Sequence, residues 1–279
     1  MIIDSHTHIY SVKIRENKEA YFPVDPVFKK FYNSPKAKLA GAGDVIDSMD
    51  KYQVDMSVVF GFPWNNISIL KEQNDYIIKS VAKYPDRLIG FCCLDPFITD
   101  AVKEVERCLD AGLKGVGELF FPNKGINKAC LKSLAPIMEI TLDKDLPVLI
   151  HTNEPVGHIY PGKTPLTLNQ IYTMIKWFPE NKIILAHMGG GILFFNLLKK
   201  EVKESFKNVY FDTAVSTLLY DKKVIPMAID IVGADKIVFG SDFPIEAPAN
   251  YFEAFEQTGM SDEIMKKICG INVQRILKI

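Results

Sequence analysis

The residues best suited to chemistry in this sequence are histidines and carboxylates that close apolar runs. The chain opens with IIDSHTHI, in which His6 and His8 lie two residues apart. Residues at this spacing in an extended strand face the same side, so the two imidazoles point together. Burying such groups costs free energy unless each has a partner. A metal ion is one such partner, although an HxH pair alone is weak evidence for it.

Three later apolar runs end on side chains of the same kind. PVLIHT, KIILAH and KIVFGSD bring His151, His187 and Asp242 to the ends of their runs. A single histidine in this position is more often a hydrogen-bonded core residue than a ligand. Four of the five histidines at such ends, together with an aspartate, indicate a metal centre. Imidazole nitrogen with one carboxylate suits zinc, and also iron, manganese or cobalt, and leaves an open position for water.

The elements that must position these residues form a regular series. Eight apolar, β-branched runs predict strands at 2–9, 54–62, 87–95, 113–120, 147–152, 182–187, 208–215 and 236–242. Stretches with helical periodicity lie between them, among them 44–53, 74–84 and 101–112. The alternation predicts an α/β fold, a (β/α)₈ TIM barrel in a single domain over 1–279. A doubly wound open sheet is the alternative. In a barrel, the carboxyl ends of the strands form the active-site face, so the histidines and Asp242 should converge there.

Composition narrows the class of partner. The net charge of −1 provides no basic surface for nucleic acid or an anionic membrane. No apolar run approaches the length of a transmembrane helix, and a strand at residue 2 leaves no room for a signal peptide, so we expect a cytoplasmic protein. The five cysteines include no CxxC pair and suggest neither a disulfide framework nor a cysteine zinc site. The expected partner is a small-molecule substrate.

One connection, at about 10–43, is far longer than the usual few residues. It joins the first predicted strand to its helix. Two interpretations stay open: a lid over the site, or a packing insertion or oligomer contact such as that of a homodimer.

Several motifs along the whole chain resemble one known family. DSHTH, LPVLIHT, IILAHMGGG, KIVFGSDFP and the closing GINVQRILKI resemble the amidohydrolase superfamily, in particular its amidohydrolase-2 branch of metal-dependent hydrolases and decarboxylases. KYPDRLIGFCCLDP, around the third strand, is also similar to that branch. The resemblance implies that His6, His8, His151 and Asp242 bind the metal. It makes His187 either a ligand of a second metal or a catalytic group.

The fourth predicted strand bears on the number of ions. Many members of the superfamily with two ions carry a carbamylated lysine at the end of this strand, whereas Lys114 here lies near its start. Glu118 occupies the end instead. It could bridge two metals, contact the substrate or accept a hydrogen bond from a residue behind the ligands. We therefore expect one ion, with zinc favoured.

We expect the reaction to be hydrolysis of a small ester, lactone or amide by a metal-activated water. Zinc lowers the pKa of a bound water to roughly 7. Asp242 would accept the water's proton and pass it to the leaving group, while His187 would orient the water or polarise the carbonyl. The alternative is non-oxidative decarboxylation of a small aromatic or unsaturated carboxylic acid, with Asp242 or His187 delivering a proton to carbon.

Four residues outside the ligand set are candidates for substrate binding: Arg15, Trp64, His158 and Lys163. Arginine binds carboxylates best, through its planar fork, yet the chain has only four arginines. This scarcity favours a less anionic substrate, and hence hydrolysis.

Overall fold

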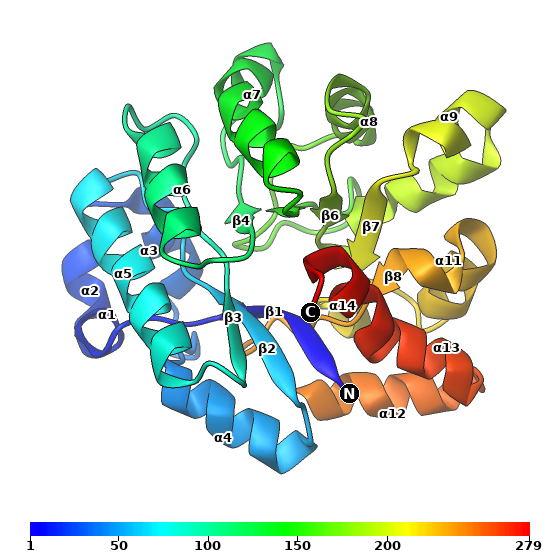
Figure 1. Cartoon of the computed structure of the whole chain (residues 1–279), viewed down its shortest axis with the longest axis horizontal. Helices are drawn as coiled ribbons and strands as arrows, with labels where there is room; N and C mark the ends of the chain where they lie inside the picture. The colour runs from blue at the N-terminus through cyan, green and yellow to red at the C-terminus, as the bar shows by residue number, and fades with distance from the viewer.

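The structure is a computed structural model that describes all residues, 1–279. Strands and helices alternate around a central ring of parallel strands (Figure 1). The strands are β1 (Ile3–His8), β2 (Met56–Phe60), β3 (Leu88–Gly90), β4 (Val116–Leu119), β5 (Val148–Ile150), β6 (Ile183–Leu185), β7 (Val209–Asp212) and β8 (Ile237–Val238). Every predicted strand is present, and the predicted (β/α)₈ barrel is confirmed.

The helices lie outside the strands, as Figure 1 shows. The longer ones are α4 (Ala42–Tyr52), α5 (Ile67–Lys83), α6 (Ala101–Asp110), α7 (Lys128–Asp143), α8 (Leu168–Trp177), α11 (Val224–Val232) and α12 (Pro248–Gln257). Shorter ones are α1 (Val12–Glu16), α2 (Lys18–Tyr21), α3 (Pro26–Tyr32), α9 (Lys200–Ser205), α10 (Ser216–Leu219), α13 (Asp262–Lys266) and α14 (Asn272–Leu277), with helical turns η1 (His187–Leu197), η2 (Ala234–Lys236) and η3 (Lys267–Ile271). None of them combines the length and the apolar character needed to cross a bilayer.

Side-chain caps determine where several helices begin. The Asn66 carboxamide accepts hydrogen bonds from the first turn of α5, and Asn127 does the same for α7. Thr167 and Gln170 form a reciprocal capping box at the start of α8. These local signals satisfy amide groups that would otherwise lack partners at the helix ends.

The strand ladders form two parallel sheets, β1-β2-β3 and β4-β5-β6-β7-β8. Single bridges connect the sheets at both seams, Cys92 with Val116 and Thr7 with Phe243. At the second seam the amide of Asp242 donates to the carbonyl of His6 at 2.9 Å. This contact brings the two ends of the sequence together at one edge of the metal centre.

Two apolar clusters stabilise the barrel. The smaller combines alternate residues along the strands, such as Val58 and Phe60, with Val273, Ile276 and Leu277 of α14. Residues of the opposite parity, such as Val59 and Ile183, join a cluster of 56 buried residues beneath the helices. The strands are therefore buried on both faces, as parallel strands usually are.

The long connection at 10–43 forms helices α1, α2 and α3 and packs on the barrel. Phe28 of α3 is fully buried and contacts the ring of Trp64, with centroids 4.4 Å apart. The C-terminal end of α3 and the following residues reach the rim of the central pocket. This insertion thus contributes to the walls of the site.

Candidate metal centre

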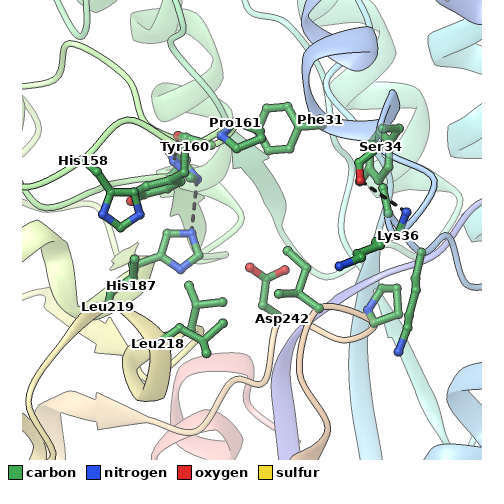
Figure 2. Close-up of a pocket in the computed structure, with 18 residues that line it drawn as sticks. Phe31, Ser34, Lys36, His158, Tyr160, Pro161, His187, Leu218, Leu219 and Asp242 are labelled. Atoms are coloured by element: carbon green, nitrogen blue, oxygen red, sulfur yellow. Dashed lines mark hydrogen bonds between the residues drawn. The ribbon is translucent and has the colours of Figure 1, made fainter.

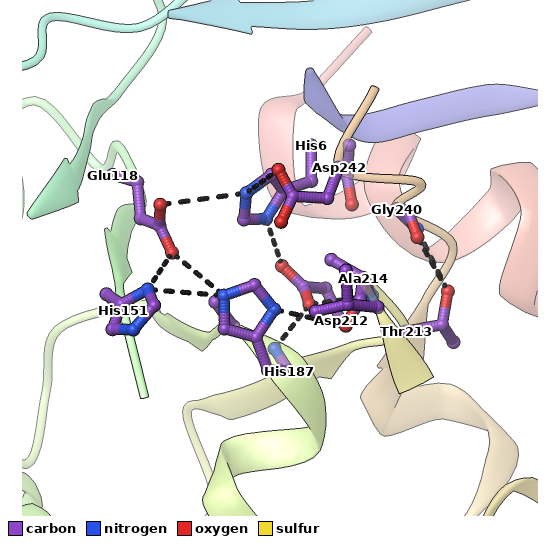
Figure 3. Close-up of polar contacts among 12 residues, drawn as sticks. His6, Glu118, His151, His187, Asp212, Thr213, Ala214, Gly240 and Asp242 are labelled. Carbon is purple, nitrogen blue, oxygen red and sulfur yellow. Dashed lines mark hydrogen bonds and ion pairs between the residues drawn. The ribbon is translucent and has the colours of Figure 1, made fainter. Parts of the chain in front are cut away.

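Six polar side chains gather at the carboxyl ends of five strands. They are His6 and His8 of β1, Glu118 of β4, His151 directly after β5, His187 after β6 and Asp242 after β8. All are buried except His8, which is partly exposed. Figure 3 shows one oxygen of Glu118 directed at His6 and the other at His151 and His187. The convergence predicted from strand ends is therefore present.

Each histidine of the centre turns one ring nitrogen outward to an acceptor. The Nδ1 of His6 donates to Oδ2 of Asp212 at 2.8 Å. The other three donate to backbone carbonyls: His8 Nδ1 to Gly61 (3.2 Å), His151 Nε2 to Gly162 (2.9 Å) and His187 Nδ1 to Ala214 (3.1 Å). A carbonyl oxygen only accepts, so the proton of each neutral imidazole lies on its outer nitrogen. The inner nitrogen then presents a lone pair to the centre, as in metal-binding histidines.

One group of inner atoms is formed by His6, His8, Asp242 and Glu118. Asp242 Oδ1 lies 3.7 Å from His6 Nε2 and 3.3 Å from His8 Nε2. Glu118 Oε2 lies 3.7 Å and 3.6 Å from the same two nitrogens. Two ligand atoms that each lie about 2.1 Å from one shared ion are separated by about 3 to 3.5 Å. The spacings in this group, 3.3 to 3.7 Å, are close to that range.

Two atoms of this group show that a cation belongs among them. His6 Nε2 and Asp242 Oδ1 are buried and have no hydrogen-bond partner. Buried polar atoms are nearly always satisfied, so an orphaned nitrogen facing an orphaned carboxylate oxygen calls for an explanation. A metal ion between them satisfies both. The centre is therefore a divalent-metal site, and its residues fit such an ion.

The second oxygen of Glu118 faces a different pair of histidines. Oε1 lies 3.0 Å from His151 Nδ1 and 3.4 Å from His187 Nε2. The two imidazole nitrogens are 3.2 Å apart. His151 thus lies across the Glu118 carboxylate from His6, His8 and Asp242, with which the sequence groups it. The set of four ligands expected from the sequence, His6, His8, His151 and Asp242, remains a prediction. Glu118 lies near three of them, His6, His8 and His151.

Electrostatics within the centre favour cations. Burial alone would lower the pKa of His6, but the carboxylates of Glu118, Asp212 and Asp242 raise it to about 10. Burial would raise the pKa of Glu118, yet the neighbouring His151 and His6 hold it well below its usual range. Glu118 is therefore ionised at neutral pH. In the metal-free protein, a proton on His6 supplies part of the positive charge that a metal would bring. A metal ion must displace this proton when it binds.

Asp212, at the end of β7, is a functional residue that the sequence reasoning missed. Its Oδ2 orients His6, and its Oδ1 accepts from the backbone amides of His187 (2.8 Å) and Ala214 (3.1 Å). It is fully buried. The signal was present, because Asp212 ends the predicted seventh strand as the other polar residues end theirs.

Asp4 and Ser241 hold the first and last strands in place beneath the ligands. Asp4 accepts from the amide of Ser241 at 2.9 Å and from its hydroxyl at 2.5 Å. Burial raises the pKa of Asp4 to about 6, against the lowering effect of these hydrogen bonds. Beside them, Gly240 packs so closely on His6 that a Cβ there would lie 2.7 Å from the His6 Cβ.

A pocket of about 520 Å³ opens onto the centre. His151, His187 and Asp242 form part of its lining, and Figure 2 shows the Asp242 carboxylate and the His187 ring projecting into it. Apolar walls come from Phe31, Leu218, Leu219, Pro244 and Ile245. Lys36 and Lys38, from the long connection, contribute positive charge.

The four residues expected to bind substrate lie in different surroundings. His158 lines the pocket. Lys163 pairs with Glu154 at 2.8 Å, within the connection from β5 to α8 that also carries His158. Trp64 is fully buried among aromatic rings, and Arg15 pairs with Asp44 at 3.2 Å. Neither of these two is among the pocket-lining residues.

Comparison with known proteins identifies the class. The family model for amidohydrolases, of the amidohydrolase-2 type, matches residues 3–279. The chain therefore belongs to the amidohydrolase-2 family and is an enzyme of the amidohydrolase superfamily.

Individual relatives of known activity are decarboxylases. Gamma-resorcylate decarboxylase of Polaromonas sp. is 26% identical over 253 residues, covering 75% of this chain and 76% of the relative. The structure of 5-carboxyvanillate decarboxylase from Sphingomonas paucimobilis matches with a TM-score of 0.77 at 18% identity, covering 100% of this chain and 99% of the other. That from Novosphingobium aromaticivorans, solved with manganese, matches with a TM-score of 0.79 at 17% identity, covering 100% and 96%.

The prediction of hydrolysis is therefore wrong, and the relatives support its alternative, decarboxylation. The physical reason lies in the argument from arginine. A divalent ion can itself hold an anionic substrate, so few arginines do not indicate a substrate without a carboxylate. The histidines and aspartate at strand ends suit either reaction.

Proposed function

We propose that this enzyme is a metal-dependent, non-oxidative decarboxylase of a small aromatic carboxylic acid that carries ring hydroxyl groups. The observation that carries the proposal is the position of Asp242 and His187, which project from the metal centre into an apolar pocket. Its volume of about 520 Å³ lies within the range for small-molecule sites and accommodates a single substituted ring. The similarity to gamma-resorcylate decarboxylase supports the same class of substrate.

The reaction requires one proton and no oxidant. The bond between the ring carbon and the carboxylate breaks, its electron pair stays with the ring, and carbon dioxide leaves. A proton adds to that ring carbon. Asp242 or His187 would take this proton from water and deliver it, because both face the space where the ring would lie. The bound metal supplies positive charge that orients the substrate oxygens.

The remaining residues hold and attract the substrate. We propose that His6, His8, His151 and Asp242 contribute metal ligands, with Glu118 among them. Phe31 and Leu218 pack against the ring, and His158 contacts it from the loop after β5. Lys36 and Lys38 attract the anion as it enters. Zinc remains the candidate from the imidazole ligands, and manganese is the candidate from the solved relatives.

The test uses protein loaded separately with Mn²⁺ and Zn²⁺. It is incubated with 2,6-dihydroxybenzoate, 5-carboxyvanillate and related hydroxybenzoates, and also with aryl esters and lactones. We expect carbon dioxide and the decarboxylated phenol in equal amounts from at least one acid. The Asp242→Asn variant should be much slower. Metal-replete protein that releases no carbon dioxide from any of these acids, but hydrolyses an ester, would overturn the proposal.

A further inference from the structure

Two tyrosines from opposite ends of the long connection meet beside the pocket. Tyr10 follows the end of β1, and Tyr32 ends α3. Their hydroxyl oxygens lie 2.6 Å apart, within hydrogen-bond distance. Tyr10 is fully buried, whereas Tyr32 is only partly buried and lines the pocket. The pair therefore connects the interior of the connection with the space where a ligand would lie.

The burial of Tyr10 determines the direction of this hydrogen bond. Each phenol has one proton to donate, and the Tyr10 hydroxyl has no partner other than Tyr32. If Tyr32 donated, the Tyr10 proton would be buried without an acceptor, which costs free energy. Tyr10 therefore donates to Tyr32. The Tyr32 proton is left without an acceptor in the protein, on the residue that lines the pocket.

Packing and charge keep the Tyr32 phenol in place and protonated. Its ring lies against Phe28, with centroids 4.6 Å apart, and edge-on to Tyr10 at 5.6 Å. Burial raises the pKa of Tyr32, and the hydrogen bond from Tyr10 opposes this. The nearby carboxylates of Asp242 and Glu118 raise the pKa further. Tyr32 is therefore a fixed, neutral donor within electrostatic reach of the metal centre.

The other hydroxyl side chains of the pocket are placed differently. Tyr160 donates to Oε2 of Glu154 at 2.7 Å, so its proton is already used. Ser34 is exposed to solvent, and its oxygen accepts from the amide of Lys36 at 3.2 Å. Of the hydroxyls that line the pocket, the one on Tyr32 thus combines a free proton with a partly buried position.

We propose that Tyr32 donates a hydrogen bond to the ring oxygen next to the substrate's carboxylate, and that Tyr10 is a positioning residue that directs the Tyr32 proton into the pocket. The inference rests on the proposed function, because it takes the ligand to be a hydroxylated aromatic acid. The ring oxygen stays on the molecule throughout the reaction, whereas the carboxylate leaves as carbon dioxide. A donor on the ring oxygen therefore holds the ring in place while the bond to the carboxylate breaks.

The test measures binding of a ligand that cannot lose carbon dioxide. Mn²⁺-loaded protein is titrated with 2-nitrophenol, whose nitro group has the planar shape of a carboxylate, and with nitrobenzene, which lacks the ring oxygen. The pH is chosen so that the ring oxygen is ionised. Tyr32→Phe should bind 2-nitrophenol about 10 to 100-fold more weakly than wild type, as for a hydrogen bond to a charged oxygen. It should bind nitrobenzene as wild type does.

The absorption spectrum of bound 2-nitrophenol gives a second measurement. A hydrogen bond to the ionised oxygen stabilises the ground state and shifts the visible band to shorter wavelength. The band should therefore lie at longer wavelength in Tyr32→Phe than in wild type. Tyr52→Phe, at the end of α4 and outside the pocket, is the matched control and should equal wild type in affinity and spectrum.

Tyr10→Phe tests the positioning role. The Tyr32 proton is then free to turn away from the ligand, so affinity for 2-nitrophenol should fall by a smaller factor, about 2 to 10-fold. Tyr10→Phe/Tyr32→Phe should bind no more weakly than Tyr32→Phe, because Tyr10 acts only through Tyr32. The double variant also covers the case in which Tyr32→Phe fails to fold, as checked by circular dichroism, since it leaves no unpaired buried phenol.

Three results overturn the inference. One is wild type that binds 2-nitrophenol no more tightly than nitrobenzene. Another is Tyr32→Phe with unchanged affinity for 2-nitrophenol, or with an equal loss for both ligands, which a change of shape alone would produce. The third is independent losses from the two substitutions, which excludes the role of Tyr10. If binding is as expected but no acid releases carbon dioxide, the proposed function fails and this contact stands, so the two failures are distinguishable.

Discussion

At the scale of single residues, Asp242 has two functions that can be separated. Its Oδ1 faces the histidines of the first group, and its carboxylate also projects into the pocket. Burial would raise its pKa, but the nearby His6 and His8 lower it, so the ionised form prevails. Such a group accepts or delivers a proton only while its partners change during the reaction.

We predict that Asp242→Asn keeps much of its metal while kcat falls about 10² to 10⁴-fold, because asparagine retains a ligating oxygen but can neither take up nor deliver a proton. Metal content and kcat are measured on the same preparation. Asp143→Asn, an exposed aspartate on α7, is the control and should match wild type. A metal-replete Asp242→Asn enzyme within a few-fold of wild type would assign the proton to another residue, with His187 the first to test.

Asp212 acts through the orientation of His6. In Asp212→Asn the amide oxygen would remain with the backbone amides of His187 and Ala214, and the NH₂ group would then face His6 Nδ1. This places the imidazole proton on Nε2, where it blocks the metal. We expect Mn²⁺ affinity to fall about 10 to 100-fold, as for other partners of ligating histidines. Titration with Mn²⁺ measures the effect, and unchanged affinity would show that Asp212 does not determine the tautomer.

At the scale of elements, the seam between β1 and β8 determines the geometry of the ligands. The two strands meet through the bonds of Asp4 with Ser241 and through the amide of Asp242 on His6. Gly240 permits the close approach because it has no side chain. The precision of the first group thus depends on packing between the first and last strands.

Gly240→Ala should disturb this seam, because the new methyl group would meet His6. We predict a loss of about 1 to 3 kcal/mol in the free energy of unfolding, the usual cost of overpacking, together with weaker metal binding. Gly43→Ala is the control: nothing lies within 4 Å of its added Cβ. Since Gly43 is the second residue of helix α4 and the added methyl group meets nothing, alanine there should change the free energy of unfolding by no more than about 0.5 kcal/mol. Equal stability of the two variants in urea unfolding would contradict the argument.

At the scale of the whole molecule, the buried charges couple metal binding to stability and pH. The pKa of His6 in the folded metal-free protein, about 10, exceeds its ordinary value of 6.5. Protonation of His6 therefore contributes stability that is fully present below pH 6.5 and is lost as pH rises towards 10. A metal ion that binds only the folded state adds stability. Its charge also replaces that of the His6 proton beside the buried carboxylates.

We predict that the Tm of metal-free protein falls as pH rises from about 6.5 to about 8. This window ends below the ordinary pKa of cysteine, above which ionisation of thiols in the unfolded chain would add to the effect. Metal-loaded protein should have a higher Tm, and the difference should widen with pH because fewer protons compete for the ligands. Calorimetry with and without chelator measures both. His6→Gln should weaken the pH dependence of the metal-free protein, and His158→Gln, at an exposed histidine, should not. A difference in Tm that narrows as pH rises would contradict this coupling.

The sequence by itself determined the barrel and the order of its strands, because alternation of short apolar runs with amphipathic stretches is a local property. The strand ends were predicted less well: β3 and β8 end at Gly90 and Val238, several residues before the predicted ends at 95 and 242. Barrel geometry then sends all carboxyl ends to one face, so the convergence of His6, His187 and Asp242 was predictable. Which nitrogen faces the centre was not, since each outer nitrogen depends on an acceptor far along the chain, such as Asp212 for His6. The position of Glu118 between two groups of ligands likewise depends on how four strands approach one another. Only the tertiary structure decides such contacts, because they arise from side-chain orientations and spacings of a few ångströms that no local pattern encodes.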